Sequence, residues 1–249
     1  KKIKKNNKEE VSTKNQKENK PFKKRLIKFI VCVFILLLIL SVSFLTFKGY
    51  IFKKLVKEMF NNSPSTVFDS NKNVIAQIGA ERNRENVDFS EIPSNLKNAY
   101  ISIEDQRFYK HHGVDVKRTG AAIFSYIIKH GSSSFGGSTI SQQLVKNLTG
   151  DDSNSINRKV KEWFYACVLD NCFSKDEILN AYLNIIYTGP NIYGVKEAAK
   201  YYFNCNLSDL SLAKCAFLAG INNAPNSYNP FSDTNKTEKI NKRTKTVLS

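Results

Sequence analysis

The N-terminal part of the chain changes from a polar stretch to a long apolar one. Residues 1–25 are rich in Lys, Asn and Glu and poor in apolar side chains, a composition typical of disorder. Residues 29–47 then run without a charge. At ~1.5 Å per helical residue, this run just crosses a hydrocarbon core of roughly 30 Å. We predict a disordered tail over 1–25, a transmembrane signal-anchor helix over 26–48 and a connector over 49–65.

Basic residues are denser before the apolar run than after it. Residues 1–28 hold twelve Lys or Arg and three Glu, which predicts a cytoplasmic N-terminus and an exported C-terminal part. Ser41 and Ser43 also fit the small-x-small pattern of a cleaved secretion signal. We favour an uncleaved anchor, because the run continues to Phe47 and the basic region is long for a signal.

After the connector the pattern becomes mainly helical. Two short apolar runs in TVFDSNKNVIAQIG, residues 66–79, predict a small hairpin. Pro93 then opens a helix whose apolar positions recur at i, i+3, i+4 and i+7, and Glu104 falls at its end.

Two further helix starts are marked by polar caps. Ser174 with Glu177 forms a capping box, and Ser208 or Asp209 opens a later helix that we expect to stop at Gly220. Strands do not alternate with helices along the chain. We therefore predict one mainly α domain over 66–249.

Composition narrows the class of protein. The 249 residues include 38 Lys or Arg against 22 Asp or Glu, a formal net charge of +16, and their 41% hydrophobic content suffices for one sizeable core. A basic tail can bind nucleic acid or anionic lipid. Beside a membrane span it is more simply a topology signal, so we predict no nucleic-acid partner. The five cysteines form no CxxC pair, and with three His they argue against a zinc site.

An acidic pair stands in a basic stretch, ISIEDQRFYKHHGVD, residues 101–115. The negative end of a helix dipole favours the neutral form of a carboxylate, and nearby cations favour the charged form. Such opposed influences on Glu104 suit a group that exchanges protons near neutral pH. An ordinary exposed Glu beside an Arg fits the same pattern.

A second candidate stretch is SSSFGGSTISQQLVKN, residues 132–147. Gly136 and Gly137 would let the backbone approach a ligand, and Thr139 with Gln142 fits a capping box. The helix start would offer unpaired N–H groups to an anion, with Lys146 two turns in. A glycine turn before a capped helix explains these residues equally well.

A third stretch is NRKVKEWFYACVLD, residues 157–170. On a helix, Arg158 and Glu162 lie one turn apart with Lys159 adjacent, so two cations and a carboxylate share one face. An ion pair on a solvated surface is the plainer alternative. The apolar positions predict a buried stripe on the other side: Val160, Trp163, Phe164 and Cys167.

In this order the stretches resemble the peptidoglycan glycosyltransferase family, which occurs as monofunctional enzymes and as the N-terminal module of class A penicillin-binding proteins. The resemblance covers roughly residues 66–249. It is carried by EDQRFYKHHGVD, GGSTISQQLVKN, RKVKE, KDEILNAYLNIIYTG with YGVKEAAKYYF, and LSLAKCAFLAGINNAPNSYNP.

The resemblance implies a lysozyme-like fold that polymerises lipid II and releases undecaprenyl diphosphate with inversion. Glu104 would be the catalytic base that removes the proton from the hydroxyl of the acceptor sugar. Glu162 would assist catalysis, directly or through a divalent ion such as Mg²⁺, with no organic cofactor. The residues implied in substrate binding are Asp105, Arg107, Phe108, Ser138, Thr139, Gln142, Gln143, Lys146, Asn147, Arg158 and Lys159.

The same resemblance implies a single-pass type II protein of the bacterial cell membrane with its catalytic domain outside the cytoplasm. Its partners would be lipid II, the growing lipid-linked glycan chain, the membrane and other cell-wall synthesis proteins. In residues 121–135 the apolar side chains would either dip into the bilayer or belong to the core: Ile123, Phe124, Tyr126, Ile127 and Ile128.

Two other functions fit parts of the pattern. A lysozyme-like hydrolase could use one Glu as a general acid, although a neutral sugar leaving group needs no cationic cluster. A non-enzymatic cell-wall scaffold needs no base at all. SxxK occurs at 94–97 and 211–214 inside predicted helices and without KTG. The abrupt end after RTKTVLS leads us to expect a transpeptidase module missing from a truncated C-terminus.

Overall fold

The computed structural model describes residues 2–61, 65–68, 74–78, 86–128, 136–153, 155–231 and 236–249. The chain divides into two compact units, residues 1–51 and residues 52–249. The first unit is the greater part of one long helix, α1 (Lys2–Asn61). Among the described residues, one segment is long and apolar enough to cross a membrane, Ile27–Lys54 within α1.

Helix α1 differs from the sequence prediction at both ends. It includes residues 2–25, where we predicted disorder. A helix already nucleated by an apolar segment propagates readily into Lys- and Glu-rich sequence, which an argument from composition alone ignores. The predicted connector is helical through Asn61, and Phe52 and Val56 are buried in the second unit. The Phe52 ring stacks on Tyr165, with ring centroids 4.2 Å apart.

After the end of α1 comes the predicted hairpin, which is confirmed. Strands β1 (Ser65–Phe68) and β2 (Val74–Ile78) pair antiparallel, with Ser65 opposite Ile78. A second short pair, β3 (Tyr187–Gly189) and β4 (Ile192–Tyr193), lies between two helices.

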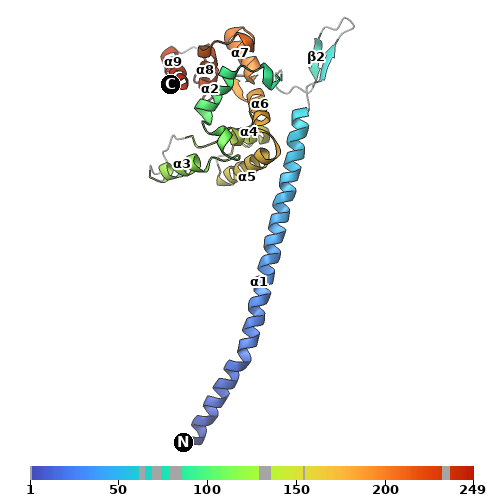
Figure 1. Ribbon diagram of the computed structural model, residues 1–249, viewed down its shortest axis with the longest axis vertical. Coiled ribbons are helices and arrows are strands. Elements are labelled where there is room, and N and C mark those ends of the chain that lie inside the picture. The colour runs from blue at the N-terminus through green and yellow to red at the C-terminus, as the bar shows by residue number, and fades with distance from the viewer. Residues whose placement is uncertain are drawn as a thin grey trace. The chain divides into compact units, whose positions relative to one another are not determined.

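The rest of the unit is helical, so the prediction of a mainly α domain is confirmed. Figure 1 shows α2 and α4 to α9 gathered together. The helices are α2 (Ser94–Glu104), α3 (Val116–Ile128), α4 (Ile140–Thr149), α5 (Ile156–Cys172), α6 (Lys175–Ile185), α7 (Val195–Phe203), α8 (Leu212–Ile221) and α9 (Thr237–Leu248). Single turns of 3₁₀ helix are η1 (Phe89–Glu91), η2 (Phe108–Lys110) and η3 (Leu207–Asp209).

One hydrophobic core joins these helices except α3, none of whose described residues contributes to it. Helix α4 contacts both α5 and α6, while α8 contacts α2 and α9. Among the largest fully buried side chains are Tyr100, Tyr182, Phe108, Leu96, Leu144, Leu169, Ile178 and Leu183. The ends of α2, α4, α6 and α8 are thereby fixed close together. The five cysteines are free thiols.

Polar caps set most of the helix starts. The Ser174–Glu177 capping box is present at α6. The predicted start of α8 is wrong, because its cap is Ser211, whose hydroxyl accepts from the N–H of Lys214, and residues 207–209 form η3 instead. The predicted stop is also wrong, since Gly220 lies within α8 and its carbonyl accepts from Arg243 of α9.

Gly113 lets the loop after η2 lie directly against α5. Its φ is +81°, a left-handed conformation that side chains rarely adopt. A Cβ atom there would lie 2.4 Å from the carbonyl oxygen of Ala166. The Gly113 carbonyl accepts a 2.6 Å hydrogen bond from the hydroxyl of Thr139, the N-cap of α4. This loop therefore contacts both helices that carry the cationic residues.

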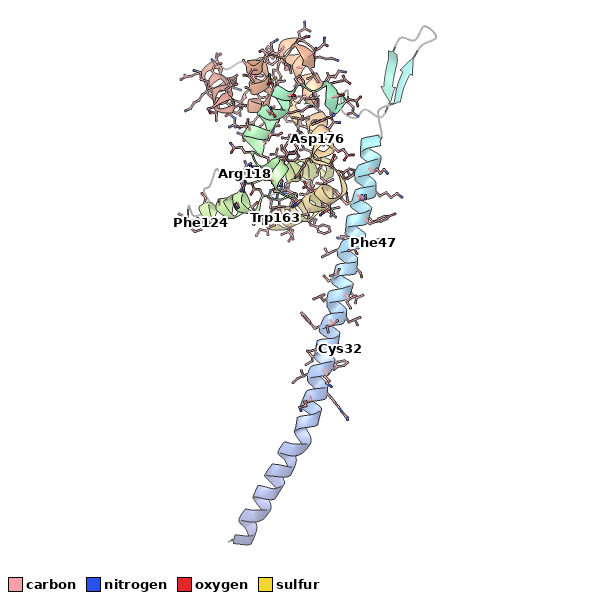
Figure 2. The ribbon with its side chains drawn as sticks, viewed as in Figure 1. Cys32, Phe47, Arg118, Phe124, Trp163 and Asp176 are labelled. Carbon is pink, nitrogen blue, oxygen red and sulfur yellow. The ribbon has the colours of Figure 1, made fainter. Side chains whose placement is uncertain are left out.

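Helix α5 buries a different face from the predicted stripe. Its buried residues are Glu162, Ala166 and Leu169, and Val160 is 53% exposed. Apolar periodicity favoured the wrong face, because it cannot register a carboxylate that is buried after pairing with cations. Trp163 lies on α5, as Figure 2 shows, and is partly buried.

Candidate active site

An open cleft of about 400 Å³ contains most of the residues predicted from the sequence. Residues from the ends of α2, α6 and α8, from α4 and the loop before it, and from the start of α5 line it. The predicted residues among them are Glu104, Ser138, Gln142, Gln143, Lys146, Asn147, Arg158, Lys159 and Glu162. Helices far apart in the sequence thus bring the first carboxylate and the cationic stretch together.

The Glu104 carboxylate, on the last residue of α2, is held by two neutral amides. Gln143 Nε2 donates to Glu104 Oε2 at 2.8 Å, and Asn222 Nδ2 donates to Oε1 at 3.1 Å. The backbone carbonyl of Glu104 also accepts from Arg118 Nη1. Each carboxylate oxygen keeps a further lone pair for a substrate hydroxyl. This arrangement orients a proton acceptor that lines the cleft.

Glu162 has a different environment, because both of its oxygens are paired with cations. Arg158 Nη1 donates to Oε1, and Lys159 Nζ donates to Oε2 at 2.8 Å. The Glu162 side chain is only 4% exposed, against 18% for Arg158 and 32% for Lys159. The predicted sharing of one face by these three residues is confirmed. A buried carboxylate so neutralised keeps two cations fixed at the cleft wall.

The Lys159 ammonium lies in a partly buried position in the cleft. Burial first, and then the charges of Arg158 and Lys146, lower the pKa of Lys159 from 10.5 to about 8. Its Nζ also donates to the hydroxyl of Ser138 at 2.7 Å. Lys146 lies farther out, where its 45% exposed side chain pairs with Asp152 at 3.1 Å. An anion entering the cleft would meet three clustered positive charges.

Two backbone N–H groups at the start of α4 are bonded within the chain, whereas we expected unpaired N–H groups there. Ile140 N donates to Oδ2 of Asp105 at 3.0 Å, and Gln142 N donates to the Thr139 hydroxyl in the predicted capping box. Asp105 is fully buried and also bonds His111 Nε2 at 2.9 Å. Internal groups therefore occupy the N–H groups of Ile140 and Gln142, and Asp105 and Thr139 organise the backbone.

Two more predicted binding residues lie outside the cleft lining. Arg107 pairs with Asp115 and lines a second hollow, of about 460 Å³, beside α3. Phe108 is fully buried in the core, with Lys175 Nζ 4.6 Å from its ring centroid. A sequence motif does not distinguish a residue that touches the cleft from one that packs behind it.

The cleft also contains residues that sequence reasoning missed: Arg118, Tyr182, Tyr187, Asn222 and Asn223. Tyr182 lies in the motif KDEILNAYLNIIYTG and the two Asn in GINNAP, both of which carried the resemblance without an assigned role. Arg118 lies at the start of α3 and its Nε donates to the Gly136 carbonyl at 3.0 Å, so it links α3 to the loop before α4.

The residues do not fit a preformed divalent-ion site. Among the described residues, no group of three or more His, Cys, Asp or Glu could hold a metal ion. Both oxygens of Glu162, the expected ligand, are bonded to cationic side chains instead. A cluster of Arg and Lys beside the carboxylate repels a divalent cation. The charge that neutralises an anion here is that of the side chains.

The apolar segment before the cleft is described only in part. Phe124 and Ile128 on α3 are 66% and 58% exposed, so neither belongs to the core. Figure 2 shows Phe124 on α3 at the margin of the domain. The side chains of Ile123, Tyr126 and Ile127 lie outside the described residues.

The chain is similar in sequence to known proteins. A family model described as "Transglycosylase" matches residues 71–249. Penicillin-binding protein 1A of Clostridium botulinum strain Langeland is 41% identical over 246 residues, which cover 93% of this chain and 29% of the relative. Penicillin-binding protein 1A/1B of Bacillus subtilis is 44% identical over 176 residues, 70% of this chain and 19% of the relative. The chain thus spans less than a third of the length of these relatives.

A solved structure, penicillin-binding protein 1A from Haemophilus influenzae, aligns with 75% of this chain and 17% of that chain. Its identity is 22% and its TM-score is 0.36, a likeness too weak to bear on the fold.

Proposed function

Because this chain belongs to the peptidoglycan glycosyltransferase (transglycosylase) family, we propose that it polymerises lipid II into β-1,4-linked glycan strands. The observation that carries the proposal is the meeting of Glu104 with Lys146, Arg158 and Lys159 in one cleft. A proton acceptor and a cationic cluster side by side suit a sugar transfer whose leaving group is a diphosphate.

Glu104 is the base of this reaction. Its carboxylate accepts the proton of the 4-hydroxyl of the acceptor sugar as that oxygen attacks the anomeric carbon of the lipid-linked donor chain. The new C–O bond forms on the face opposite the breaking bond to the diphosphate, so the configuration inverts. The electron pair leaves with undecaprenyl diphosphate, and the proton stays on Glu104.

The leaving diphosphate is stabilised by Lys146, Arg158 and Lys159. Preorganised cations in a partly buried cleft stabilise developing negative charge without reorganising at the moment of reaction. Glu162 acts through them, since its ion pairs hold Arg158 and Lys159 at the wall of the cleft. No step of the proposal passes through a metal ion.

The apolar segment Ile27–Lys54 suits the lipid nature of the substrate. A membrane helix would confine the domain to the surface where an undecaprenyl-linked donor resides, which raises their effective concentration. The basic residues before the segment favour a cytoplasmic N-terminus and a type II orientation.

The test is elongation of lipid II by the full chain in detergent or vesicles. The wild-type protein lengthens glycan chains, whereas Glu104→Gln abolishes elongation and retains lipid II binding, because the amide keeps the shape of the carboxylate but accepts no proton. Glu91→Gln, at an exposed carboxylate outside the cleft, is the matched control and keeps full activity.

Two results would contradict the proposal. Shortening of pre-made glycan without elongation would indicate a hydrolase of this fold. Unchanged elongation in Glu104→Gln would remove the base from the mechanism.

A further inference from the structure

We infer that Tyr182 and Asn222 are positioning residues that, through a closed ring of hydrogen bonds, hold Glu104 in its reactive orientation. The inference rests on the proposed function, because it assigns a role around the base of that reaction. Neither residue carried a role in the sequence analysis.

The ring joins four side chains from four helices. Asn222 Nδ2, at the end of α8, donates to Glu104 Oε1 at 3.1 Å and to the Tyr182 hydroxyl at 2.9 Å. The Tyr182 hydroxyl donates to Gln143 Oε1 at 3.0 Å. Gln143 Nε2 donates to Glu104 Oε2 at 2.8 Å, which closes the ring.

Donor and acceptor chemistry allows one direction around this ring. The amide of Asn222 has two hydrogens on Nδ2, one for each of its two acceptors. The Tyr182 hydroxyl accepts one of them, so its own hydrogen goes to the amide oxygen of Gln143. Flipping either amide would direct its oxygen at the carboxylate. Every side-chain contact of the ring to Glu104 is therefore a donated one, which suits the carboxylate form that acts as a base.

Tyr182 is the fixed point of the ring. Its side chain is fully buried, and its ring meets that of Tyr100 edge to face at 6.1 Å. Burial, and next the charge of Glu104, raise the pKa of Tyr182 well above its usual range. Its hydroxyl therefore remains a donor at every pH at which the protein works, and its core packing prevents it from following a displaced carboxylate.

The ring compensates for the position of Glu104 at a helix end. As the last residue of α2, this side chain is supported by one turn only on its N-terminal side. The side-chain amides of Gln143 and Asn222 each donate to one carboxylate oxygen of Glu104. The Tyr182 hydroxyl is hydrogen-bonded to both amides. A misplacement of about 1 Å can cost roughly 100-fold in rate, so loss of one ring member should slow the chemical step.

The test compares two buried tyrosines in the full chain. Tyr182→Phe removes only the hydroxyl of the ring and lowers kcat for lipid II elongation about 10-fold or more, with KM within about 2-fold, because binding contacts remain. Tyr100→Phe is the matched control. It removes a buried hydroxyl that donates to the Leu218 carbonyl at 3.1 Å and lies outside the ring. It lowers the Tm comparably and keeps kcat within about 2-fold.

A double-mutant cycle separates a ring from two independent contacts. Asn222→Ala, at a partly exposed position, lowers kcat by a similar factor, and the double variant with Tyr182→Phe loses little more than the worse single variant. Multiplied losses would indicate that the two residues act independently. That result would overturn the inference.

The outcomes also separate this inference from the proposed function. Full kcat in both Tyr182→Phe and Asn222→Ala, with elongation by the wild type and none by Glu104→Gln, overturns the inference alone. Absence of elongation by the wild type overturns both. If Tyr182→Phe does not fold, Asn222→Ala alone decides, and an unchanged kcat in that variant overturns the inference.

Discussion

The two carboxylates of the cleft have contrasting neighbours. Glu104 is gripped by two neutral amides, whereas both oxygens of Glu162 are paired with cations. They line the same cleft and are the same residue type. The difference teaches that a carboxylate's neighbours decide its chemistry. Neutral donors orient a group and leave it able to take a proton, while two cations hold it as a permanent counter-ion.

The largest expected effect sets the two residues side by side. Glu104→Gln lowers kcat by about 10³-fold or more, since general-base catalysis is worth roughly 10²–10⁴-fold. Glu162→Gln lowers kcat by only about 10–100-fold, because it loosens Arg158 and Lys159 without removing the base. Single-turnover elongation of lipid II measures both. Equal losses would mean that the contrast between the two sites has no functional meaning.

The next effect is on stability. Arg158→Ala leaves Glu162 buried with one cation instead of two, and we expect the free energy of unfolding to fall by about 2 kcal/mol. The loss is less than that of a fully isolated buried charge, because Lys159 stays paired with it. Chemical denaturation followed by circular dichroism gives the value. An unchanged midpoint would show that one cation suffices.

The third effect is a change of affinity with pH. Lys159 has a pKa of about 8 in place of 10.5, so its ammonium is lost as the pH rises from 7 to 9. We expect KM for lipid II to rise several-fold over this range, roughly as the charged fraction falls. Lys159→Arg remains charged and flattens the profile. A KM of the wild type that stays constant between pH 7 and 9 would contradict the assignment.

The same shift affects folding in a defined direction. Because the pKa of Lys159 is lower in the folded chain, the folded state binds fewer protons than the unfolded state between pH 8 and 10.5. The contribution of this side chain to stability is therefore fully present above pH 10.5. It is lost progressively as the pH falls from 10.5 through 8.

The smallest effect is at an exposed pair. Lys146 and Asp152 are 45% and 85% exposed, and Asp152→Asn should change the free energy of unfolding by less than about 0.5 kcal/mol. The variant serves as the surface counterpart of Arg158→Ala in the same denaturation experiment. A loss as large as that of Arg158→Ala would mean that burial does not distinguish the two ion pairs.

Local signals predicted much of the fold correctly. The capping boxes of α4 and α6 and the end of α2 at Glu104 follow from a few neighbouring residues. The prediction of where α8 starts was wrong, because three polar residues close together could each act as its N-cap. The buried face of α5 was predicted wrongly, because hydrophobic periodicity treats every carboxylate, including that of Glu162, as a surface group.

The candidate site was predictable only where its residues lie in recognisable motifs. Glu104, Arg158 and Lys159 could be named, but their meeting depends on the packing of α4 between α5 and α6. The bond from Asn222 to Glu104 joins residues 118 positions apart. No pattern within one window of sequence contains such a contact, and an asparagine in a loop motif gives no sign of its partner.

Gly113 determines how closely its loop can pack against α5. With only a hydrogen atom between its Cα and the Ala166 carbonyl, the loop that contains Gly113 lies directly against α5, the helix of Arg158 and Lys159. Any larger residue there would act as a wedge and drive the proton acceptor and the charge cluster apart. The close contact between Gly113 and α5 thus helps to set the distance between Glu104 and the cations of the cleft.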